Sequence, residues 1–390
     1  MAEPRRIYLD HAATTPLCAE AREAMAGAMD SLFGNPSSLH AEGRAARGAL
    51  EDARARLANL LGAQGFRVIF TSGGTEADNA AVLGILLPPD RRDAGPGHAI
   101  TSAVEHPAVL NAFGIAREEG LALSVLDVNR DGRVDPDAVR AAMRADTRLV
   151  SIMAANNEVG TVQPIPEIGR VARDRGIPFH TDAVQLLGKA PLDLTSLPVD
   201  LVSLSAHKIG GPRGIGILCV REGIALQPLL RGGQQEGGLR AGTESVVLAI
   251  GFARAAEIAL GGREGERARI AALRDRLRRA LEVTIGRVTF NTPSDGALPN
   301  ILNVAFHGLN GEALLLYLDR LGVSVSTGSA CSQSGRRPSH VLEAMGRSAS
   351  EVRSSLRFSL GRATGEWEID DAVRRLGRAI GELQHVAGES

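Results

Sequence analysis

The chain has 390 residues, 44% of them hydrophobic and 23% charged, and its formal net charge is −1. A chain of this length is too long for one small core and predicts about two or three domains. The balanced charge argues against a nucleic-acid-binding protein, which needs a basic surface, and an aromatic content of 3% argues against base-stacking platforms. No apolar run approaches the roughly 20 residues of a membrane-spanning helix, so we expect no membrane span.

The start of the chain and its cysteines indicate a cytoplasmic protein. The first residues lead directly into Ile7-Tyr8-Leu9, without the apolar segment of a secretory signal. Cys18, Cys219 and Cys331 are widely spaced and form no C-x-x-C pair. We therefore expect neither a disulfide framework nor a metal site made by the protein alone.

In chain order, residues 1–40 are expected to be irregular, with a short strand and turn in 8–16 and a second turn in 33–38. A helix through Leu50, Ala53 and Leu57 follows, because its leucines and alanines recur at helical spacing. Strand-like runs then appear at 67–71, 98–102, 121–127, 148–154, 177–182, 199–204 and 215–220, separated by helical stretches at 75–87, 106–119, 136–145 and 164–175. This alternation predicts a doubly wound α/β fold with a mostly parallel, seven-stranded sheet.

The pattern changes near residue 245. Two helices follow, and then strand–helix–strand elements at 301–305, 312–321 and 323–326, a strand at 356–360 and a final helix at 366–385. This part predicts a smaller α+β domain. We expect the large domain to cover residues 15–260 and the small domain to combine residues 1–14 with 261–390.

Ligands of such sheets lie at the carboxyl ends of the strands, so the residues that follow each apolar run are the candidates for function. After the first run, Gly74 and Thr75 begin a helix, whose free N–H groups make a phosphate site; a simple helix cap is the alternative. The longer G-x-x-x-x-G-K-[ST] loop is absent, which argues against a nucleoside triphosphate.

Three further strand ends carry polar residues. His106 follows the second run and is either catalytic or structural, and Asn157 lies in a polar turn after the fourth. Asp182 closes the fifth run, where a buried carboxylate needs a cationic partner such as a pyridinium nitrogen. The alternative for Asp182 is a helix N-cap.

Lys208 follows the sixth run and precedes a glycine-rich loop at 210–216. Only Lys189 and Lys208 are lysines among 44 basic residues, so a general need for positive charge does not account for Lys208. A desolvated lysine can form a Schiff base, whereas phosphate binding or contact with solvent is the alternative. Together the strand ends offer four features: a phosphate site at a helix start, His106 as a neighbour for a ring, Asp182 as a partner for a pyridinium nitrogen, and Lys208. This combination indicates a pyridoxal 5′-phosphate (PLP) site.

Ten segments of the chain carry a resemblance to a known family. They are Tyr8–Pro16 (YLDHAATTP), Phe33–Ser38 (FGNPSS), Thr71–Asn79 (TSGGTEADN), Glu105-His106, Asn156–Gly160 (NNEVG), Asp182–Gln185, Ser205–Lys208 with Gly211–Gly216, Arg240–Thr243 (RAGT), Thr327–Cys331 (TGSAC) and Arg357–Gly361 (RFSLG). In these motifs the chain resembles the NifS/IscS-type cysteine desulfurases, PLP enzymes of the class V aminotransferase group. The resemblance covers almost the whole chain and implies the PLP-dependent transferase fold type I.

The resemblance also implies a role for each matching residue. Lys208 would bind the cofactor covalently, His106 would stack on its ring, Asp182 would hold the ring nitrogen and Gln185 the phenolic oxygen. Asn157 would lie beside the cofactor, and four residues would hold its phosphate: Gly74, Thr75, Ser205 and His207. Thr243 would reach the phosphate of the neighbouring subunit in a homodimer, and Asn35 and Arg357 would bind the substrate carboxylate.

Cys331 would be the catalytic nucleophile, because it lies in a segment of small residues, whereas Cys219 lies in an apolar run that predicts a core position. The implied reaction removes sulfur from L-cysteine and gives L-alanine and a persulfide on Cys331. Lys208 would remove the Cα proton, and His106 would act as acid and base. The sulfur would then pass to an acceptor protein of iron–sulfur cluster assembly or tRNA thiolation.

Two positions depart from the family pattern. Gln234 replaces a glycine and Gly237 stands where arginine is frequent, which affects the expected subunit contact. A selenocysteine lyase or a class V aminotransferase is the nearest alternative function. A binding scaffold without catalysis is a further alternative, although the Lys208, Asp182 and Cys331 set argues against it.

Overall fold

The computed structural model describes residues 5–87, 97–327 and 338–388. Its largest sheet has seven strands in the order β2-β8-β7-β6-β5-β3-β4. The bounds are β2 Phe66–Thr71, β3 His98–Ser102, β4 Ala122–Leu126, β5 Thr147–Ser151, β6 Phe179–Asp182, β7 Leu201–Ser205 and β8 Gly216–Arg221. Only β8 runs against its neighbours, so the predicted doubly wound and mostly parallel sheet is confirmed.

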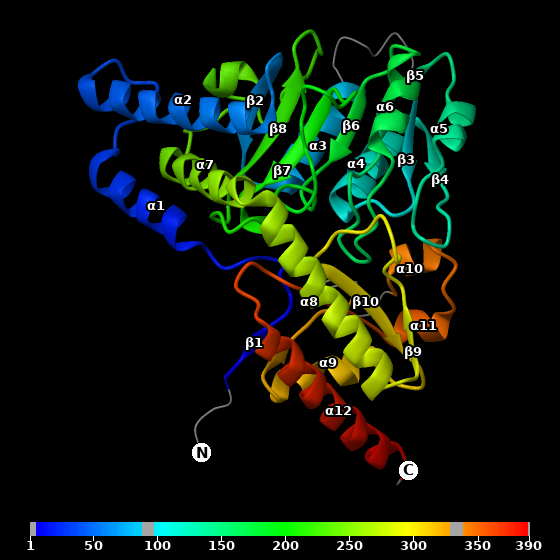
Figure 1. Ribbon diagram of the computed structural model, residues 1–390. Helices are drawn as coiled ribbons and strands as arrows, with labels where there is room; N and C mark the ends of the chain where they lie inside the picture. The colour runs from blue at the N-terminus through cyan, green and yellow to red at the C-terminus, as the bar shows by residue number, and fades with distance from the viewer. Residues whose placement is uncertain (1–4, 88–96, 328–337, 389–390) are drawn as a thin grey trace.

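Helices cover both faces of this sheet (Figure 1). One face packs against α2 (Ala41–Leu61), α5 (Pro136–Ala142), α6 (Ile165–Arg173) and α7 (Val246–Gly261). The other face packs against α3 (Gly74–Leu86) and α4 (Pro107–Glu118). Successive residues of β2 alternate between the two cores, with Val68 and Phe70 in the first and Ile69 in the second. Burial on both faces explains why the central strands are continuously apolar.

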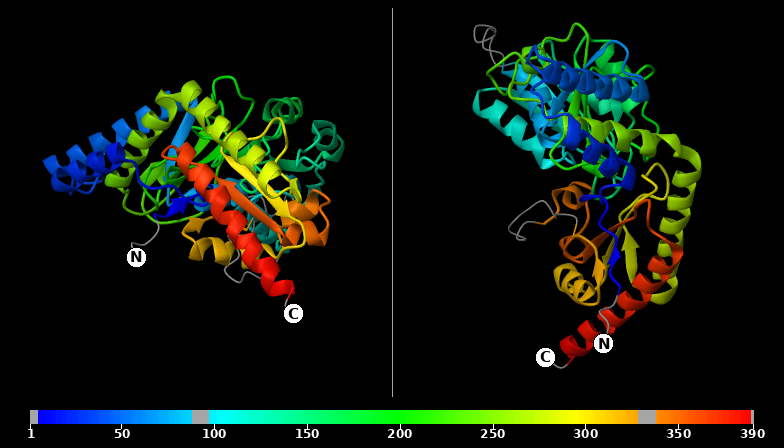
Figure 2. Two further views of the ribbon diagram at one scale, coloured as in Figure 1. Left: turned by 60° about the horizontal axis from the view of Figure 1, so that its bottom comes forward. Right: turned by 90° about the vertical axis from the view of Figure 1, so that its left-hand side faces the viewer.

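A second sheet lies at the other end of the molecule and is antiparallel, in the order β12-β10-β9. Its strands are β9 Val288–Phe290, β10 Ile301–Phe306 and β12 Ser355–Ser359; the helices of this part are α8 (Arg263–Thr284), α9 (Gly311–Arg320), α10 (His340–Ala344), α11 (Ala349–Arg353) and α12 (Glu366–Gly388). Figures 1 and 2 show α8 running from the large sheet to this end, where both chain termini lie. The N-terminal strand β1 (Ile7–Tyr8) pairs with β11 (Val323–Ser324), and Ile7 and Leu9 join the local core. The division at residues 14 and 260 stays a prediction.

The N-terminal forty residues differ from their prediction as an irregular segment. Residues Ala19–Ser31 form α1, which buries Ala21, Met25 and Ala28. These residues lie at helical spacing, but two of the three are alanines, which give little apolar contrast with the alanines on the exposed face. The short β9, α10 and α11 were also not predicted. Within the described parts of the chain, we find no helix that is long and apolar enough to cross a membrane.

Candidate active site

Lys208 lies where the sequence predicts, at the carboxyl end of β7. It ends a single turn of 3-10 helix, η2 (Ala206–Lys208), and its Nζ donates to the carbonyl oxygens of Ala12 at 2.8 Å and Ala13 at 2.7 Å. These carbonyls belong to the turn that follows β1. The N-terminal segment therefore closes over the lysine, although almost 200 residues separate them.

The same turn holds the neighbour of the lysine. Thr14 Oγ1 lies 3.0 Å from Nδ1 of His207, and Thr15 Oγ1 donates to the His207 carbonyl at 2.8 Å. Burial and the nearby cation of Lys208 lower the pKa of His207 to about 4. His207 is therefore neutral at physiological pH and can still donate one N–H to an anion.

Asp182 and Gln185 lie beside each other after β6. Asp182 is 6% exposed, and its Oδ1 accepts from the backbone N–H of Val184 at 2.9 Å. Burial raises the pKa of Asp182, while the nearby His106 and Lys208 act in the opposite direction. Gln185 is 4% exposed, and its Nε2 donates to the Ala12 carbonyl at 2.9 Å. Both side chains thus reach toward the lysine end of the site.

His106 is the N-cap of α4, and its Nδ1 accepts from the backbone N–H of Ala108 at 3.2 Å. This contact fixes the tautomer, because Nδ1 acts as acceptor and the ring proton of the neutral form must lie on Nε2. Burial lowers the pKa of His106, against the attraction of Asp182, and Lys208 lowers it further. The imidazole is therefore kept neutral close to both residues.

The start of α3 provides the expected phosphate position. A methyl group at Gly74 would lie 2.8 Å from Val184 Cγ2 and 3.7 Å from Ser205 Cβ, so these three residues meet. Ser205 is 2% exposed, yet its Oγ has no hydrogen-bond partner among the described residues. Thr75 is exposed beside it. A buried hydroxyl next to the free N–H groups of a helix start is a suitable site for an anion.

Arg357 lies in β12 and connects the second sheet to the site. Its Nη1 donates to the Asn157 carbonyl at 2.8 Å, and its Nη2 contacts Asp10 Oδ1 at 2.8 Å. The residue is 2% exposed, and its Nε has no hydrogen-bond partner among the described residues. This contact is with the backbone of Asn157, and the predicted place of its side chain beside the cofactor stays a prediction.

Three predicted residues are not joined to this cluster by the described contacts. Asn35 is exposed and its Oδ1 accepts from Ser37 N in a turn before α2, and Thr243 is exposed in the loop before α7. Cys331 lies outside the described residues. Cys219 is fully buried in β8, which confirms its core position.

Sequence reasoning missed a polar layer behind Asp182. His180 bridges Ser151 Oγ at 2.8 Å and Ser203 Oγ at 2.9 Å, and burial lowers its pKa to about 3. Asp78 Oδ1 lies 3.7 Å from His180 Nε2, and burial and Asp182 raise the pKa of Asp78. Burial thus disfavours the charged forms of His180, Asp78 and Asp182, and a bound cation beside Asp182 would favour the ionised form of that carboxyl group.

Glu105 and Lys189 also lie at this site. Glu105 accepts from Ser102 Oγ at 2.5 Å and Met153 N at 3.0 Å, and burial raises its pKa to about 8. Lys189 Nζ donates to Gln185 Oε1 at 3.0 Å. The sequence analysis assigned no role to Lys189, although the rarity of lysine could have pointed to it. Glu105 and Asp78 lie inside the quoted motifs, and no feature of the sequence distinguishes them.

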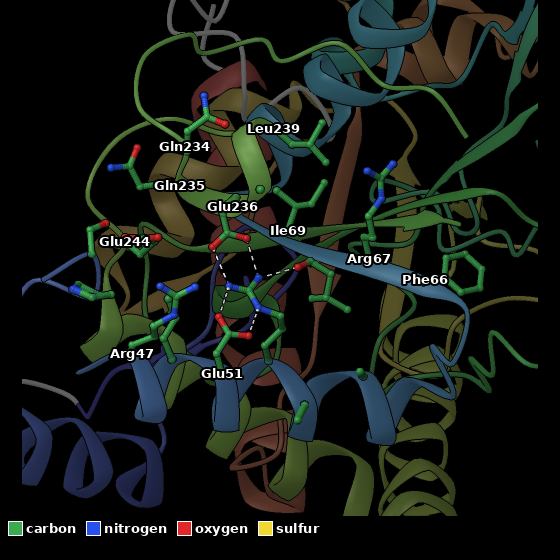
Figure 3. A pocket seen from close by; sticks show the side chains of 18 residues that line it. Arg47, Glu51, Phe66, Arg67, Ile69, Gln234, Gln235, Glu236, Leu239 and Glu244 are labelled. Atoms are coloured by element: carbon green, nitrogen blue, oxygen red, sulfur yellow. Dashed lines mark hydrogen bonds and ion pairs between the residues drawn. The ribbon is translucent and has the colours of Figure 1, made fainter. Parts of the chain in front are cut away.

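A separate cleft of about 860 Å³ lies between α2, the edge strand β2 and residues 234–239 (Figure 3). None of the predicted catalytic, cofactor or substrate residues lines it. Figure 3 shows Glu51 and Glu236 on opposite sides of a guanidinium, which belongs to Arg54. Glu236 has a φ of 49°, and Gly237 and Gly238 follow with φ of 66° and 81°. The departure at Gly237 thus falls in a left-handed turn that favours glycine.

Comparisons with known proteins identify the family of the chain. The family model Aminotransferase class-V matches residues 7–371. A cysteine desulfurase IscS from Dictyoglomus turgidum is 45% identical over 98% of this chain and 96% of its own. A solved NifS-like protein superposes with a TM-score of 0.90 at 35% identity, covering 97% of this chain and 100% of the other. A structure titled SspA in complex with cysteine has a TM-score of 0.78 at 36% identity, covering 91% and 98%. The chain belongs to the class V aminotransferase family and, within it, to the cysteine desulfurases.

Proposed function

We propose that the protein is a PLP-dependent cysteine desulfurase that converts L-cysteine to L-alanine and leaves the sulfur on Cys331 as a persulfide. The observation that supports this most directly is the convergence of Lys208, Asp182 and His106 at the carboxyl ends of three strands. The charges of Asp182 and Lys208 both act on the pKa of His106, which requires the three groups to be close. This arrangement suits a reaction at the Cα of an amino acid.

The described residues fit PLP by two independent features. The buried Ser205 hydroxyl lacks a hydrogen-bond partner and lies against Gly74 at the start of α3, where a phosphate would accept from it. The raised pKa of the buried Asp182 would fall again beside a protonated pyridine nitrogen. Thr75 and His207 would complete the phosphate site, His106 and Asn157 would flank the ring, and Gln185 would contact its phenolic oxygen. PLP, when bound, supplies an electron sink for the Cα of the substrate.

The residues of the chain have separable tasks in this mechanism. The Lys208 amine would bind the cofactor and later take the Cα proton, and the Asp182 carboxylate would hold the proton of the ring nitrogen. Neutral His106 carries its ring proton on Nε2 and moves protons to and from the substrate. Arg357 Nε, which has no hydrogen-bond partner among the described residues, would help to hold the substrate carboxylate, and Asn35 would assist it.

Cys331 completes the reaction. Its thiolate attacks the sulfur of L-cysteine, so an S–S bond forms as the Cβ–S bond breaks, and Cβ then takes up a proton to give alanine. An acceptor protein of iron–sulfur cluster assembly or tRNA thiolation would take the persulfide sulfur. We keep the cytoplasm as the proposed compartment.

The test incubates the purified protein with PLP and L-cysteine and measures alanine and sulfide. Cys331→Ala should lose at least about 100-fold in alanine formation while it keeps the visible band of bound cofactor. Cys18→Ala is the matched control, because this half-buried cysteine has no assigned role, and it should keep wild-type activity. Full activity in Cys331→Ala would overturn the mechanism. The same assay with selenocysteine separates a desulfurase from a selenocysteine lyase, and a keto acid product would indicate an aminotransferase.

A homodimer with shared sites is part of the proposal. Thr243 is exposed three residues after Arg240, whose ion pair with Glu76 at 2.9 Å ties the loop to the first turn of α3. The loop thus lies near the phosphate position, and a second subunit could receive Thr243. Sedimentation of the purified protein should give twice the monomer mass, and Thr243→Ala should weaken PLP binding; a monomer with unchanged PLP affinity in Thr243→Ala would refute this part.

A further inference from the structure

Lys189 is one of two lysines in the chain. Hydrogen bonds through the side-chain amide of Gln185 connect it to the other, Lys208. Lys189 Nζ donates to Gln185 Oε1 at 3.0 Å, and Gln185 Nε2 donates to the Ala12 carbonyl at 2.9 Å. The same carbonyl accepts from Lys208 Nζ at 2.8 Å. A continuous hydrogen-bonded path therefore runs from Lys189 through Gln185 and Ala12 to Lys208.

The chemistry of the two ends fixes the direction of the amide. An ammonium group has only donors, and a backbone carbonyl has only acceptors. Gln185 satisfies both only when Oε1 faces Lys189 and the NH2 group faces Ala12. A reversed amide would place donors against donors at one end and acceptors against acceptors at the other. Because Gln185 is 4% exposed, water cannot readily replace these contacts.

We propose that Lys189 is a positioning residue for the cofactor: it holds the carbonyl oxygen of Gln185 and thereby keeps the N–H groups of this amide directed toward the Lys208 side of the site. The inference rests on the proposed function, in which Gln185 donates to the phenolic oxygen of PLP. The NH2 group carries two N–H bonds, and the contact with Ala12 uses one. The other is the donor that the cofactor would meet.

The surroundings of Lys189 are strongly basic. Lys208 in η2 and Arg357 in β12 act with burial to lower the pKa of Lys189 to about 7. Lys189 in turn contributes to the lowered pKa of His11 and of His207. A neutral amine still has N–H donors, and the Ala12 carbonyl at the other end still only accepts, so Gln185 keeps its direction on both sides of this pKa. The restraint that Lys189 adds is strongest below this pKa, where the ammonium group has only donors.

A double-mutant cycle on the holoenzyme tests whether Lys189 acts through Gln185. Lys189→Met, Gln185→Leu and the double variant are titrated with PLP, and the dissociation constant is read from the visible band. Loss of one buried hydrogen bond should weaken PLP binding about 10-fold in Lys189→Met. The double variant should bind no more weakly than Gln185→Leu alone. Lys189→Arg keeps an N–H donor and should stay within about threefold of the wild type.

Each outcome bears on a different claim. A wild-type protein that shows no cofactor band refutes the proposed function. A wild-type band with unchanged PLP affinity in Lys189→Met refutes the role of Lys189 alone, and so do losses that add fully in the double variant. If Lys189→Met does not fold, Lys189→Ala replaces it in the cycle, because alanine also lacks a donor, with the same expectation of non-additivity.

Discussion

The seven-stranded sheet buries charged groups in two places. At one place their hydrogen-bond partners are present, and at the other several partners are missing. At the edge strand β2, Arg54 and Glu236 share two contacts of 2.6 and 2.9 Å, and Glu236 is 2% exposed in its side chain. Arg54 also donates to the Val68 carbonyl at 2.6 Å, and Glu236 accepts from the Phe70 N–H at 3.0 Å. The ion pair thus occupies backbone groups that an edge strand otherwise leaves open to other chains.

At the carboxyl end of the same sheet, several buried polar atoms have no hydrogen-bond partner among the described residues. Ser205 Oγ, Glu105 Oε2, Asp78 Oδ1 and Arg357 Nε all lack a hydrogen-bond partner within the described parts of the chain. Three carboxyl groups there have raised pKa values because of burial: Asp78, Glu105 and Asp182. A satisfied pair indicates a structural role, whereas unmet polar groups around a lysine indicate a place for a ligand. The two regions should therefore respond differently to substitution.

Lys208→Ala should have the largest effect on function and a small effect on folding. Loss of the amine removes both the attachment of the cofactor and the base for the Cα proton, so alanine formation should fall at least about 1000-fold. Its Nζ contacts two carbonyls that can find other partners, so the folded protein should persist. Alanine release and circular dichroism measure the two effects. A Lys208→Ala protein that keeps a tenth of wild-type activity would contradict the assignment of the site.

Local patterns explain how much of this site the sequence could predict. Apolar runs that end in polar turns are short-range features, so the strand ends carrying Asp182, His106 and Lys208 were found correctly. The Arg54–Glu236 pair joins residues 182 positions apart, and the Gln185–Ala12 contact joins residues 173 positions apart. Such pairings depend on the order of strands in the sheet, which periodicity does not contain.

Breaking the Arg54–Glu236 pair should chiefly affect stability. Glu236→Gln leaves the guanidinium without its buried counter-charge, and removal of one partner of a buried pair costs about 3 to 5 kcal/mol in the free energy of unfolding. Because Arg54 is 20% exposed in its side chain, we expect the lower end of this range. Chemical denaturation measures the loss. The matched Glu51→Gln variant, whose side chain is 53% exposed, should lose less than about 1 kcal/mol.

Glu105→Gln should change the free energy of unfolding by the smallest amount, and it should raise this free energy, whereas Glu236→Gln lowers it. Glu105 has a pKa of about 8 in the folded protein and an ordinary value of 4.5, so the folded state binds its proton more tightly than the unfolded state. That contribution to stability is complete below about pH 4.5 and is lost as the pH rises through 8. Between pH 6 and 8 the wild type should lose about 2 kcal/mol from this group.

Glutamine cannot ionise, so Glu105→Gln should lack this loss and gain stability over the wild type as the pH rises. Asp78 and Asp182 contribute slopes of the same sign to both proteins, and the difference between them isolates Glu105. Denaturation at pH 6 and pH 8 gives that difference directly. A variant whose stability follows the wild type at both pH values would mean that Glu105 is already ionised in the folded protein. The carboxyl end of the sheet would then tolerate buried charge as the β2 edge does, and the contrast between the two regions would fail.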